Sequence, residues 1–339
     1  MEQWCTLMDG IDGLKVQRAP MPTDLGHDEV LVRISRVSLN HRDMKIVCGD
    51  FRGRYDLPSE PMVVCSDASG IVVEVGGHAA ASSWAKGDRV LTLVRPTHDH
   101  GPTRAEHHAL GLGFPKPGVL CRYRIFKAAG LVRIPDSMSL DEACTLPTAG
   151  TTAWMALNWN YPIGRPRTGS DTTVLLQGTG GVSVITSSSE DKLQRARELG
   201  AQQTINYHTT PSWADEALRL TDGKGVDVIV ETGGPATMQQ SLKAVAEGGS
   251  ISAVGVLTGL TEITGQTPIG LSLINRNATL RGINIGPKDR VEEMLEEYCM
   301  KRIHPVIDRQ FGFDQVKEAF DYVRGGKHFG KVVINVDGT

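Results

Sequence analysis

Short runs of β-branched and aliphatic residues, bounded by turn residues, fill the first part of the chain. Residues 30–34 (Val-Leu-Val-Arg-Ile) and 70–75 predict strands, and residues 86–91 predict a turn that leads into another strand. Residues 95–118 are rich in proline, glycine and histidine and have no hydrophobic period, which predicts a long surface loop. The first part of the chain is therefore expected to be β-rich.

The pattern changes at Ser139, where helices and strands begin to alternate. Ser139 and Glu142 stand at the N-cap and capping-box positions of a predicted helix. Strands are predicted at 174–177, 184–186, 226–230 and 250–254, with helices at 190–199 and 237–246. This alternation indicates a parallel sheet with helices on its faces. From residue 290 the sequence predicts a helix, a second helix at 314–323 and a closing strand at 331–334.

Composition and charge narrow the class of protein. The 339 residues suggest two domains. Lys plus Arg is 36 and Asp plus Glu is 39, a net charge of −3, which argues against nucleic acid as a partner. Glycine, at 38 residues or about 11 %, exceeds the usual value of roughly 7 %, as expected where backbone closely approaches a ligand.

The chain ends and the cysteines favour a cytoplasmic protein. No secretory signal, membrane span or lipidation motif is visible, so we expect no membrane association. Six cysteines are scattered without a Cys-x-x-Cys pair, which argues against disulfides and a zinc ribbon.

A glycine turn directly follows the predicted strand at 174–177. Gly178, Gly180 and Gly181 form a variant of the dinucleotide-binding fingerprint, in which glycines let the backbone approach a pyrophosphate. The next strand ends in serines where an NAD-specific site usually has an acidic residue. Ser187, Ser188 and nearby Lys192 suit a 2′-phosphate better, which favours NADP(H). The alternative is that these serines cap the helix at 190–199.

The chain resembles the medium-chain dehydrogenase/reductase superfamily, in its quinone-oxidoreductase-like, zinc-type alcohol dehydrogenase-like branch. The stretches that carry the resemblance are 38–43 (Ser-Leu-Asn-His-Arg-Asp), 70–76, 87–90, 146–154, 174–183, 190–201, 225–227, 248–249 and 328–333 (His-Phe-Gly-Lys-Val-Val). Their combined order along almost the whole chain is more specific than any single motif.

The resemblance implies an α/β fold with two domains. A GroES-like β-barrel domain (1–135, completed by 290–339) would accompany a Rossmann-like, doubly wound parallel sheet (136–289), with a small-molecule substrate in the cleft between them. It also implies that Tyr207 reaches the adenosine 2′-phosphate, that Gly233 and Gly255 bind the cofactor, and that the protein is a homodimer through strands near 278–283.

Zinc-dependent relatives hold their metal with Cys, His or Glu, and Cys. The resemblance puts Asn40, Ser66 and Thr148 at those places, and none is a good zinc ligand. The histidines at 98, 100, 107 and 108 offer an alternative metal cluster, although hydrated loop histidines are the commoner case. We therefore expect no metal.

Zinc-free members of this branch typically reduce activated double bonds such as enones, quinones or enoyl thioesters. By that analogy Asn40 and His41 are candidates for polarising or protonating the substrate, with Asp43 orienting them. The alternative is that Asn40 and Asp43 only fix a turn. The expected function is that of a zinc-independent, NADPH-dependent oxidoreductase.

One departure from the family pattern bears on this expectation. Only six residues, 178–183, connect two strands that should run parallel, whereas a parallel crossover normally needs a dozen or more and includes a helix. The Rossmann-like sheet thus lacks its first crossover helix, and one sheet face should be exposed. An incorrectly spliced or minor isoform, or a catalytically silent relative that binds a ligand or partner, are alternatives, as is an alcohol dehydrogenase.

Overall fold

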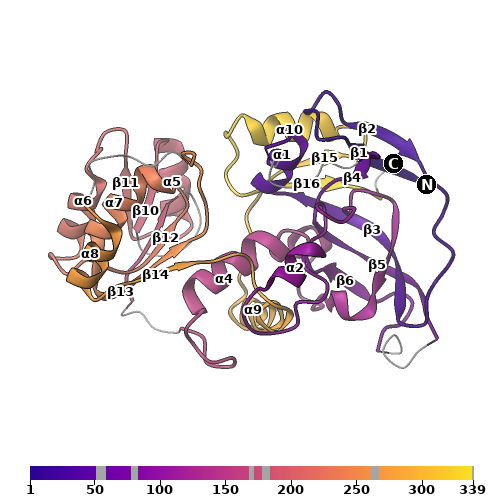
Figure 1. Cartoon of the computed structure of the whole chain (residues 1–339), viewed down its shortest axis with the longest axis horizontal. Coiled ribbons are helices and arrows are strands. Elements are labelled where there is room, and N and C mark those ends of the chain that lie inside the picture. Colours follow the sequence, from indigo (N-terminus) through magenta and orange to yellow (C-terminus); the bar gives the residue numbers. More distant parts are fainter. Residues whose placement is uncertain (51–58, 78–82, 168–171, 178–183, 261–266, 338–339) are drawn as a thin grey trace. The chain divides into compact units, whose positions relative to one another are not determined.

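The computed structural model describes residues 1–50, 59–77, 83–167, 172–177, 184–260 and 267–337. The chain forms two compact units (Figure 1). The first contains Met1–Thr151 and Ile285–Thr339, and the second contains Thr152–Asn284. The breaks thus fall after residues 151 and 284, where the sequence placed them after 135 and 289. No helix in the described part of the chain is long and apolar enough to cross a membrane.

The first unit is built on a seven-stranded sheet whose order is β15-β16-β3-β5-β6-β8, with β7 also paired to β3. Its strands are β3 (Glu29–Leu39), β5 (Asp67–Val75), β6 (Arg89–Thr92), β7 (Tyr123–Lys127), β8 (Leu131–Arg133), β15 (Ile307–Gly312) and β16 (Lys331–Asn335). A three-stranded sheet joins β2 (Lys15–Arg18), β1 (Glu2–Thr6) and β4 (Met62–Val63). Both ends of the chain therefore contribute to this unit.

β3 is the central element of the first unit. It is antiparallel to β5, β7 and β16, and the register pairs Val332 of β16 with Leu39 at the end of β3. Most of its side chains are buried, as expected for a strand packed on both faces. Strands from the two chain ends are thus fixed side by side, and the residues that follow β3 lie beside the beginning of β16.

The helices of the first unit are α1 (His41–Val47), α2 (Ala105–Ala109), α3 (Leu140–Ala143), α9 (Lys288–Lys301) and α10 (Val316–Arg324). The predicted cap at Ser139 is confirmed, because its Oγ accepts the Glu142 N–H at 3.2 Å. A π-helical turn at Leu146–Gly150 then leads into α4 (Thr151–Asn158).

The surface loop predicted at residues 95–118 is wrong in part. The segment contains α2, and its later half is drawn into the unit, with Leu112 and Phe114 buried. The Arg42 guanidinium donates hydrogen bonds to the main-chain carbonyls of Leu112 (2.9 Å) and Phe114 (3.1 Å). A local pattern could not reveal this anchoring, because Arg42 lies far away in sequence.

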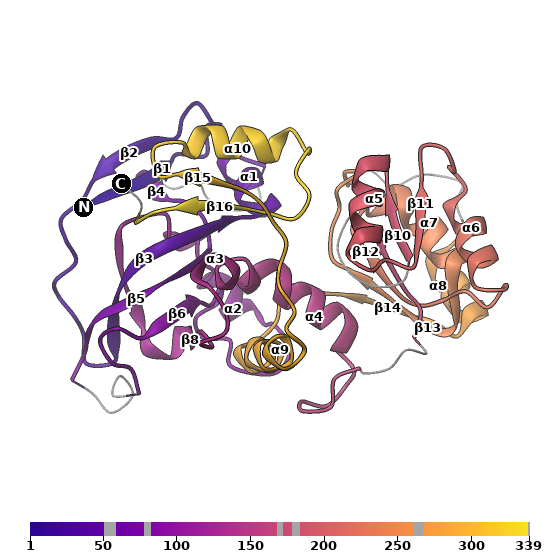
Figure 2. The same cartoon turned by 180° about the vertical axis from the view of Figure 1, so that it is seen from behind.

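The second unit contains the predicted parallel sheet. Its order is β11-β10-β9-β12-β13-β14, and every pair is parallel. The strands are β9 (Val174–Gln177), β10 (Val184–Ser187), β11 (Gln203–Asn206), β12 (Val226–Glu231), β13 (Val245–Ala253) and β14 (Thr279–Gly282); the helices are α5 (Glu190–Glu198), α6 (Trp213–Leu220), α7 (Pro235–Ala244) and α8 (Ile269–Arg276). Figure 2 shows the helices of this unit packed around the sheet.

The strands β9 and β10 are adjacent and parallel, although only residues 178–183 separate them. Those six residues lie outside the described residues. The sheet order nevertheless matches a doubly wound fold, because β9 sits between β10 and β12.

The expected exposure of one sheet face is wrong at the positions that the structure describes. Side chains alternate between faces along a strand, so Val174, Ile185 and Val228 point away from the face that carries Leu175. All three are at most 4 % exposed. Ser252 of β13 lies on that same face, and its Oγ donates to Ala156 O of α4 at 2.7 Å, while α5 packs against β10. Other helices of the chain therefore bury part of this face.

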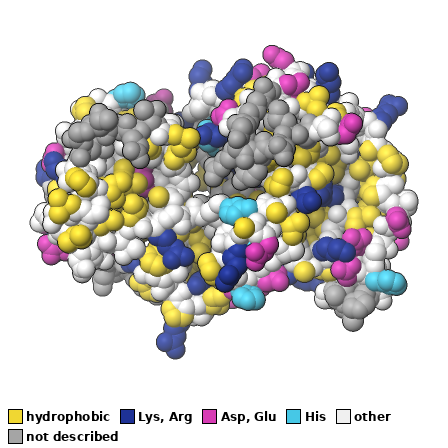
Figure 3. All heavy atoms as spheres, in the orientation of Figure 1, with side chains coloured by type: hydrophobic (Ala, Val, Ile, Leu, Met, Phe, Trp, Pro, Cys, Tyr) yellow, Lys and Arg dark blue, Asp and Glu magenta, His cyan; other side chains and the backbone are white. Residues whose placement is uncertain are grey.

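Exposed apolar residues of the second unit gather instead on α8. Ile269, Leu271 and Ile274 are 42 %, 49 % and 77 % exposed, and Figure 3 shows hydrophobic side chains at the surface in this region. α8 directly precedes β14, an edge strand of the sheet. This is the segment near which the sequence predicted a dimer contact.

The packing of β9 gives a first testable expectation. Leu175 is fully buried in a core shared with α6 and α7, so Leu175→Ala should lower the free energy of unfolding by about 2–5 kcal/mol. Leu199→Ala, at a leucine that is 58 % exposed, is the matched control and should change it by less than about 1 kcal/mol. Urea unfolding followed by circular dichroism measures both, and equal small effects would contradict a packed core around β9.

Candidate functional site

The turn between β3 and α1 positions the predicted residues Asn40, His41 and Asp43. Asn40 is the N-cap of α1, and the Asp43 carboxylate accepts the Asn40 main-chain N–H at 2.9 Å. Asp43 therefore does fix this turn, as the alternative interpretation held. Asn40 and Asp43 are 8 % and 1 % exposed, whereas His41 is exposed.

The side chain of Asn40 is held by a residue from the other end of the chain. Lys331 Nζ donates to Asn40 Oδ1 at 2.6 Å and to the Leu39 carbonyl at 2.8 Å. This follows from the pairing of β16 with β3, which sets Lys331 beside the end of β3. Lys331 is half-buried as a residue, and desolvation of its ammonium lowers the pKa of Lys331, opposed by the charges of Asp67 and Asp43.

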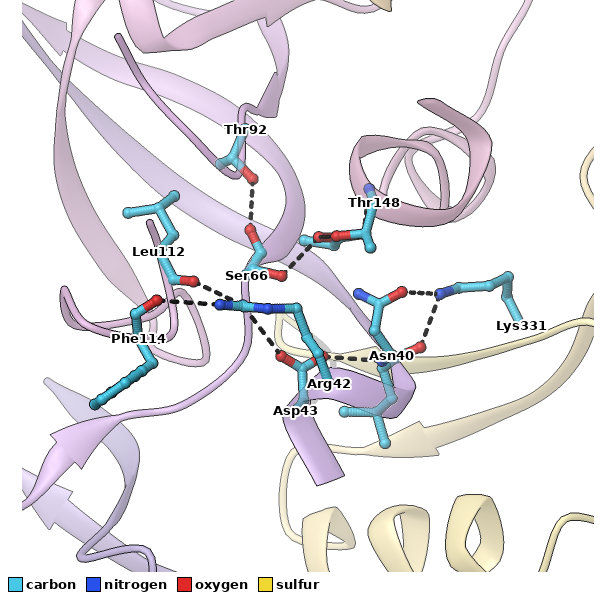
Figure 4. A network of polar contacts seen from close by, with 11 residues as sticks. Asn40, Arg42, Asp43, Ser66, Thr92, Leu112, Phe114, Thr148 and Lys331 are labelled. Carbon is cyan, nitrogen blue, oxygen red and sulfur yellow. Dashed lines mark hydrogen bonds and ion pairs between the residues drawn. The ribbon is translucent and has the colours of Figure 1, made fainter. Parts of the chain in front are cut away.

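A second cluster of hydrogen bonds centres on Asp67 at the start of β5. Its carboxylate accepts the Thr148 main-chain N–H (2.8 Å), the Thr148 hydroxyl (2.6 Å) and the Ser66 hydroxyl (2.8 Å). Thr92 Oγ1 of β6 donates to the Ser66 carbonyl at 3.2 Å. The π-helical turn at Leu146–Gly150 brings Thr148 to this cluster, and Figure 4 shows it close to Asn40 and Lys331.

Two polar atoms of the site are buried without a hydrogen-bond partner among the described residues. They are Asn40 Nδ2 and Asp43 Oδ1, and Arg42 Nη1 lies 3.9 Å from the latter. Buried polar groups of native proteins are nearly always paired, so such atoms mark places where something else can bind. Figure 4 shows the Asn40 amide nitrogen on the side away from Lys331.

The surroundings of the Asp43 carboxyl raise its pKa. Burial, assisted by the charge of Asp67, raises the pKa of Asp43 to about 6, although Arg42 and the Asn40 N–H oppose the shift. Asp43 can therefore gain or lose a proton near neutral pH. By contrast, desolvation and Lys45 lower the pKa of His41.

Asp43→Asn should make the free energy of unfolding less dependent on pH. The folded-state pKa of about 6 exceeds the ordinary aspartate pKa of 3.8. The folded state therefore binds the extra proton in that window, and this group makes the wild type less stable as pH rises through it. Relative to wild type, the variant should gain about 3 kcal/mol between roughly pH 4 and pH 7.

Urea unfolding at several pH values measures this gain. Asp50→Asn, at an exposed carboxyl just beyond α1, is the matched control. The free energy of unfolding is plotted against pH for wild type and for Asp43→Asn. Plots that stay parallel between roughly pH 4 and pH 7 would contradict a raised pKa of Asp43.

Zinc-dependent relatives hold their metal at three positions, and the residues at those positions in this chain do not fit a zinc ion. Asn40 Oδ1 faces an ammonium, and the hydroxyls of Ser66 and Thr148 both donate to Asp67. Amide and hydroxyl oxygens used in this way supply none of the thiolate or imidazole donors that zinc prefers. Among the described residues, no group of three or more His, Cys, Asp or Glu side chains could hold a metal ion, the histidines near residue 100 included.

The predicted cofactor residues lie in the second unit. Gly178, Gly180 and Gly181 fall outside the described residues. Ser187 and Tyr207 meet at the carboxyl ends of β10 and β11, where the Tyr207 N–H donates to the Ser187 carbonyl at 3.1 Å. Ser188 is exposed and Tyr207 is 42 % exposed.

The helix-capping alternative holds for a neighbouring serine. Ser189 is the N-cap of α5, and its Oγ accepts the Lys192 main-chain N–H at 3.4 Å. Ser187 is buried and its Oγ accepts the Ser189 main-chain N–H at 3.3 Å, whereas Ser188 is exposed. That Ser187 and Ser188 bind the cofactor stays a prediction. Glu190, the first acidic residue after β10, is paired with Arg197 at 2.6 Å.

Gly233 and Gly255 lie at the carboxyl ends of β12 and β13. A Cβ on Gly233 would lie 2.2 Å from Thr237 Oγ1, and one on Gly255 would lie 2.7 Å from the Thr232 carbonyl. Packing within the unit therefore requires glycine at both places. Whether either contacts a cofactor stays a prediction.

The sequence did not single out a buried carboxylate beside Gly233. Glu231 accepts the N–H groups of Gly233 (2.7 Å) and Gly234 (2.9 Å) at the start of α7. Its other oxygen accepts from Gln177 Nε2 at 2.6 Å. An acidic residue at the end of an apolar strand was the available signal. Lys331 and Asp67 were missed as well, and their signal was a charge at the edge of a buried strand.

Comparison with known proteins agrees with this architecture. Residues 26–136 match the alcohol dehydrogenase GroES-like domain, and residues 175–299 match the zinc-binding dehydrogenase family. A zinc-type alcohol dehydrogenase-like protein of Schizosaccharomyces pombe is 37 % identical over 97 % of both chains. A quinone oxidoreductase-like protein 2 homolog of Nematostella vectensis is 30 % identical over 92 % of this chain and 83 % of its own. The solved structure of an NAD-dependent alcohol dehydrogenase has 28 % identity and a TM-score of 0.83 over 99 % of this chain and 100 % of its own.

The chain therefore belongs to the medium-chain dehydrogenase/reductase superfamily, as the sequence motifs indicated. It combines a GroES-like unit with a Rossmann-like parallel sheet, and it is an oxidoreductase of that type. The family implies a nicotinamide cofactor.

Proposed function

We propose that the protein is a zinc-independent, NADPH-dependent oxidoreductase that reduces an activated alkene or carbonyl of enone, quinone or enoyl type. The observation that carries this proposal is the Asn40 amide, whose Nδ2 is buried and has no hydrogen-bond partner among the residues that the structure describes, at a place where zinc-dependent relatives bind metal. A hydrogen-bond donor suits a substrate whose oxygen gains negative charge without a metal beside it.

NADPH, when bound, supplies a hydride to the β-carbon of the alkene or to the carbonyl carbon. Negative charge then develops on the substrate oxygen, and Asn40 Nδ2 is the group that would donate a hydrogen bond to it. Asp43 holds the main chain of Asn40 in place through its N–H. His41, exposed beside them, is the candidate that delivers the proton to the α-carbon of the enolate or to the alkoxide.

The preference for NADPH rests on the carboxyl end of β10. Ser187 and Ser188 stand there in place of an acidic residue, and Lys192 follows within the first turn of α5. The ion pair with Arg197 occupies Glu190. Hydroxyls and a cation favour a 2′-phosphate, whereas an NAD site offers a carboxylate to the ribose.

The reaction is tested with NADPH and two probes, 9,10-phenanthrenequinone and cyclohex-2-enone, followed by absorbance at the wavelength of NADPH. Asn40→Ala should lower kcat/KM by about 100-fold, the usual effect of removing an oxyanion donor. His41→Ala reports on the proton donor in the same assay. No turnover of either probe by the wild type, or one tightly held zinc per chain that turnover requires, would overturn the proposal.

The cofactor is tested by titrating NADPH and NADH against the protein while following its fluorescence. Lys192→Glu should weaken NADPH by about tenfold or more and NADH by much less, because only NADPH carries the 2′-phosphate. Lys224→Glu, at an exposed lysine of the same unit, is the charge-matched control. Equal losses for both nucleotides would remove Lys192 from the phosphate site.

The same titration distinguishes the proposed reductase from the second candidate function, that of a catalytically silent relative. The six-residue connection between β9 and β10 favours a catalytically silent relative. Absence of binding by either nucleotide at millimolar concentration would support that function instead.

A further inference from the structure

The orientation of the Asn40 amide is determined by Lys331. An ammonium group has three donors and no acceptor, so the Asn40 atom that faces Lys331 Nζ at 2.6 Å must be the oxygen. The amide nitrogen consequently points the other way, and it is this atom that has no partner among the described residues. An asparagine without such a neighbour could present either atom.

Lys331 itself is held from two directions. The pairing of β16 with β3 fixes its main chain, and the Leu39 carbonyl accepts a second hydrogen bond from Nζ at 2.8 Å. Desolvation lowers the pKa of Lys331, and the carboxylates of Asp67 and Asp43 oppose that shift and favour the protonated form. The ammonium is thus a fixed donor and a fixed positive charge at the amide oxygen.

A charged donor at an amide oxygen changes the chemistry of the amide nitrogen. It draws electron density toward oxygen, so the N–H groups become stronger donors, and the effect is larger where water is excluded. It also fixes the amide plane before substrate arrives, which avoids the cost of ordering it during the reaction.

We propose that Lys331 is a positioning residue for the reductase reaction, which acts through Asn40 to aim and polarise the amide N–H that binds the developing oxyanion. This inference rests on the proposed function, because it assigns Lys331 to the same oxygen-binding group. Lys331 does not touch the substrate in this scheme. Its effect passes through a single hydrogen bond, and that bond can be broken from either side.

A double-mutant cycle tests this coupling in turnover of 9,10-phenanthrenequinone with NADPH. Lys331→Met should lower kcat by about tenfold with little change in KM, and Lys331→Arg, which keeps a charged donor, should recover part of the loss. In the Asn40→Ala background, Lys331→Met should cost less than about twofold, because the group through which it acts is already gone. Lys127→Met, at an exposed lysine of the same unit, is the matched control.

A second measurement needs no turnover. In protein labelled with ¹⁵N-asparagine, the side-chain NH₂ signal of Asn40 is identified by its absence in Asn40→Ala. This signal should shift in Lys331→Met, stay near its wild-type position in Lys331→Arg and not move in Lys127→Met.

The outcomes separate the two proposals. Full additivity of the two substitutions, or an Asn40 signal unmoved by Lys331→Met, would overturn the role of Lys331 while Asn40→Ala could still support the reductase. A wild type that turns over neither probe would overturn the proposed function, and the role of Lys331 with it.

Discussion

The antiparallel pairing of β16 with β3 is the contact on which the candidate site depends. It brings a lysine from residue 331 to an asparagine at residue 40, and it does so through main-chain hydrogen bonds that leave little freedom of position. Around this pair the fold buries Asp43 and Asp67, so positive and negative groups lie together in a region of low polarity. Charges buried in this way cost free energy unless they are paired, so the network must be nearly complete to be stable. Asn40 Nδ2 and Asp43 Oδ1, which have no hydrogen-bond partner among the described residues, therefore stand out in this network.

In the second unit, too, polar groups at the ends of strands are hydrogen-bonded within the protein. Glu231 fills the N-terminal end of α7, where it accepts two main-chain N–H groups that would otherwise be free to bind an anion. Gln177, at the end of β9, joins this network through Glu231 and through the N–H groups of Thr232 and Gly233. The carboxyl end of β12 is thus occupied by the protein itself. The exposed hydroxyl of Ser188 and the ring of Tyr207 stay open to solvent at the ends of β10 and β11.

Much of the fold followed from local patterns, because each pattern had a local physical cause. The alternation after Ser139 predicted the parallel sheet, and the helix at 190–199 ends at Gly200, whose positive φ of 99° favours glycine. The site was harder to predict, because its contacts join residues far apart in sequence. Asn40 and Asp43 could be named from a motif, but the contacts of Lys331 and Asp67 could not be predicted. Pairing of β16 with β3 brings Lys331 to Asn40, and pairing of β5 with β3 sets Asp67 beside Ser38. The buried part of the loop at 95–118 was missed for the same reason, because its anchor is Arg42.

The short connection between β9 and β10 affects the two parts of the proposed chemistry differently, namely polarisation of the substrate and binding of the nucleotide. Asn40, Asp43, Asp67, Thr148 and Lys331 all belong to the first unit, and none of their hydrogen bonds depends on β9 or β10. The proposed oxygen-binding group is therefore independent of the segment 178–183. Nucleotide binding is not, because a crossover helix normally presents its positive end to the pyrophosphate, and six residues span at most about 20 Å. Loss of that helix would weaken cofactor binding, while it would leave the amide that we propose to polarise the substrate intact. A relative altered in this way would keep affinity for carbonyl compounds after losing the hydride source, and this is why nucleotide binding must be measured separately from the chemistry of Asn40.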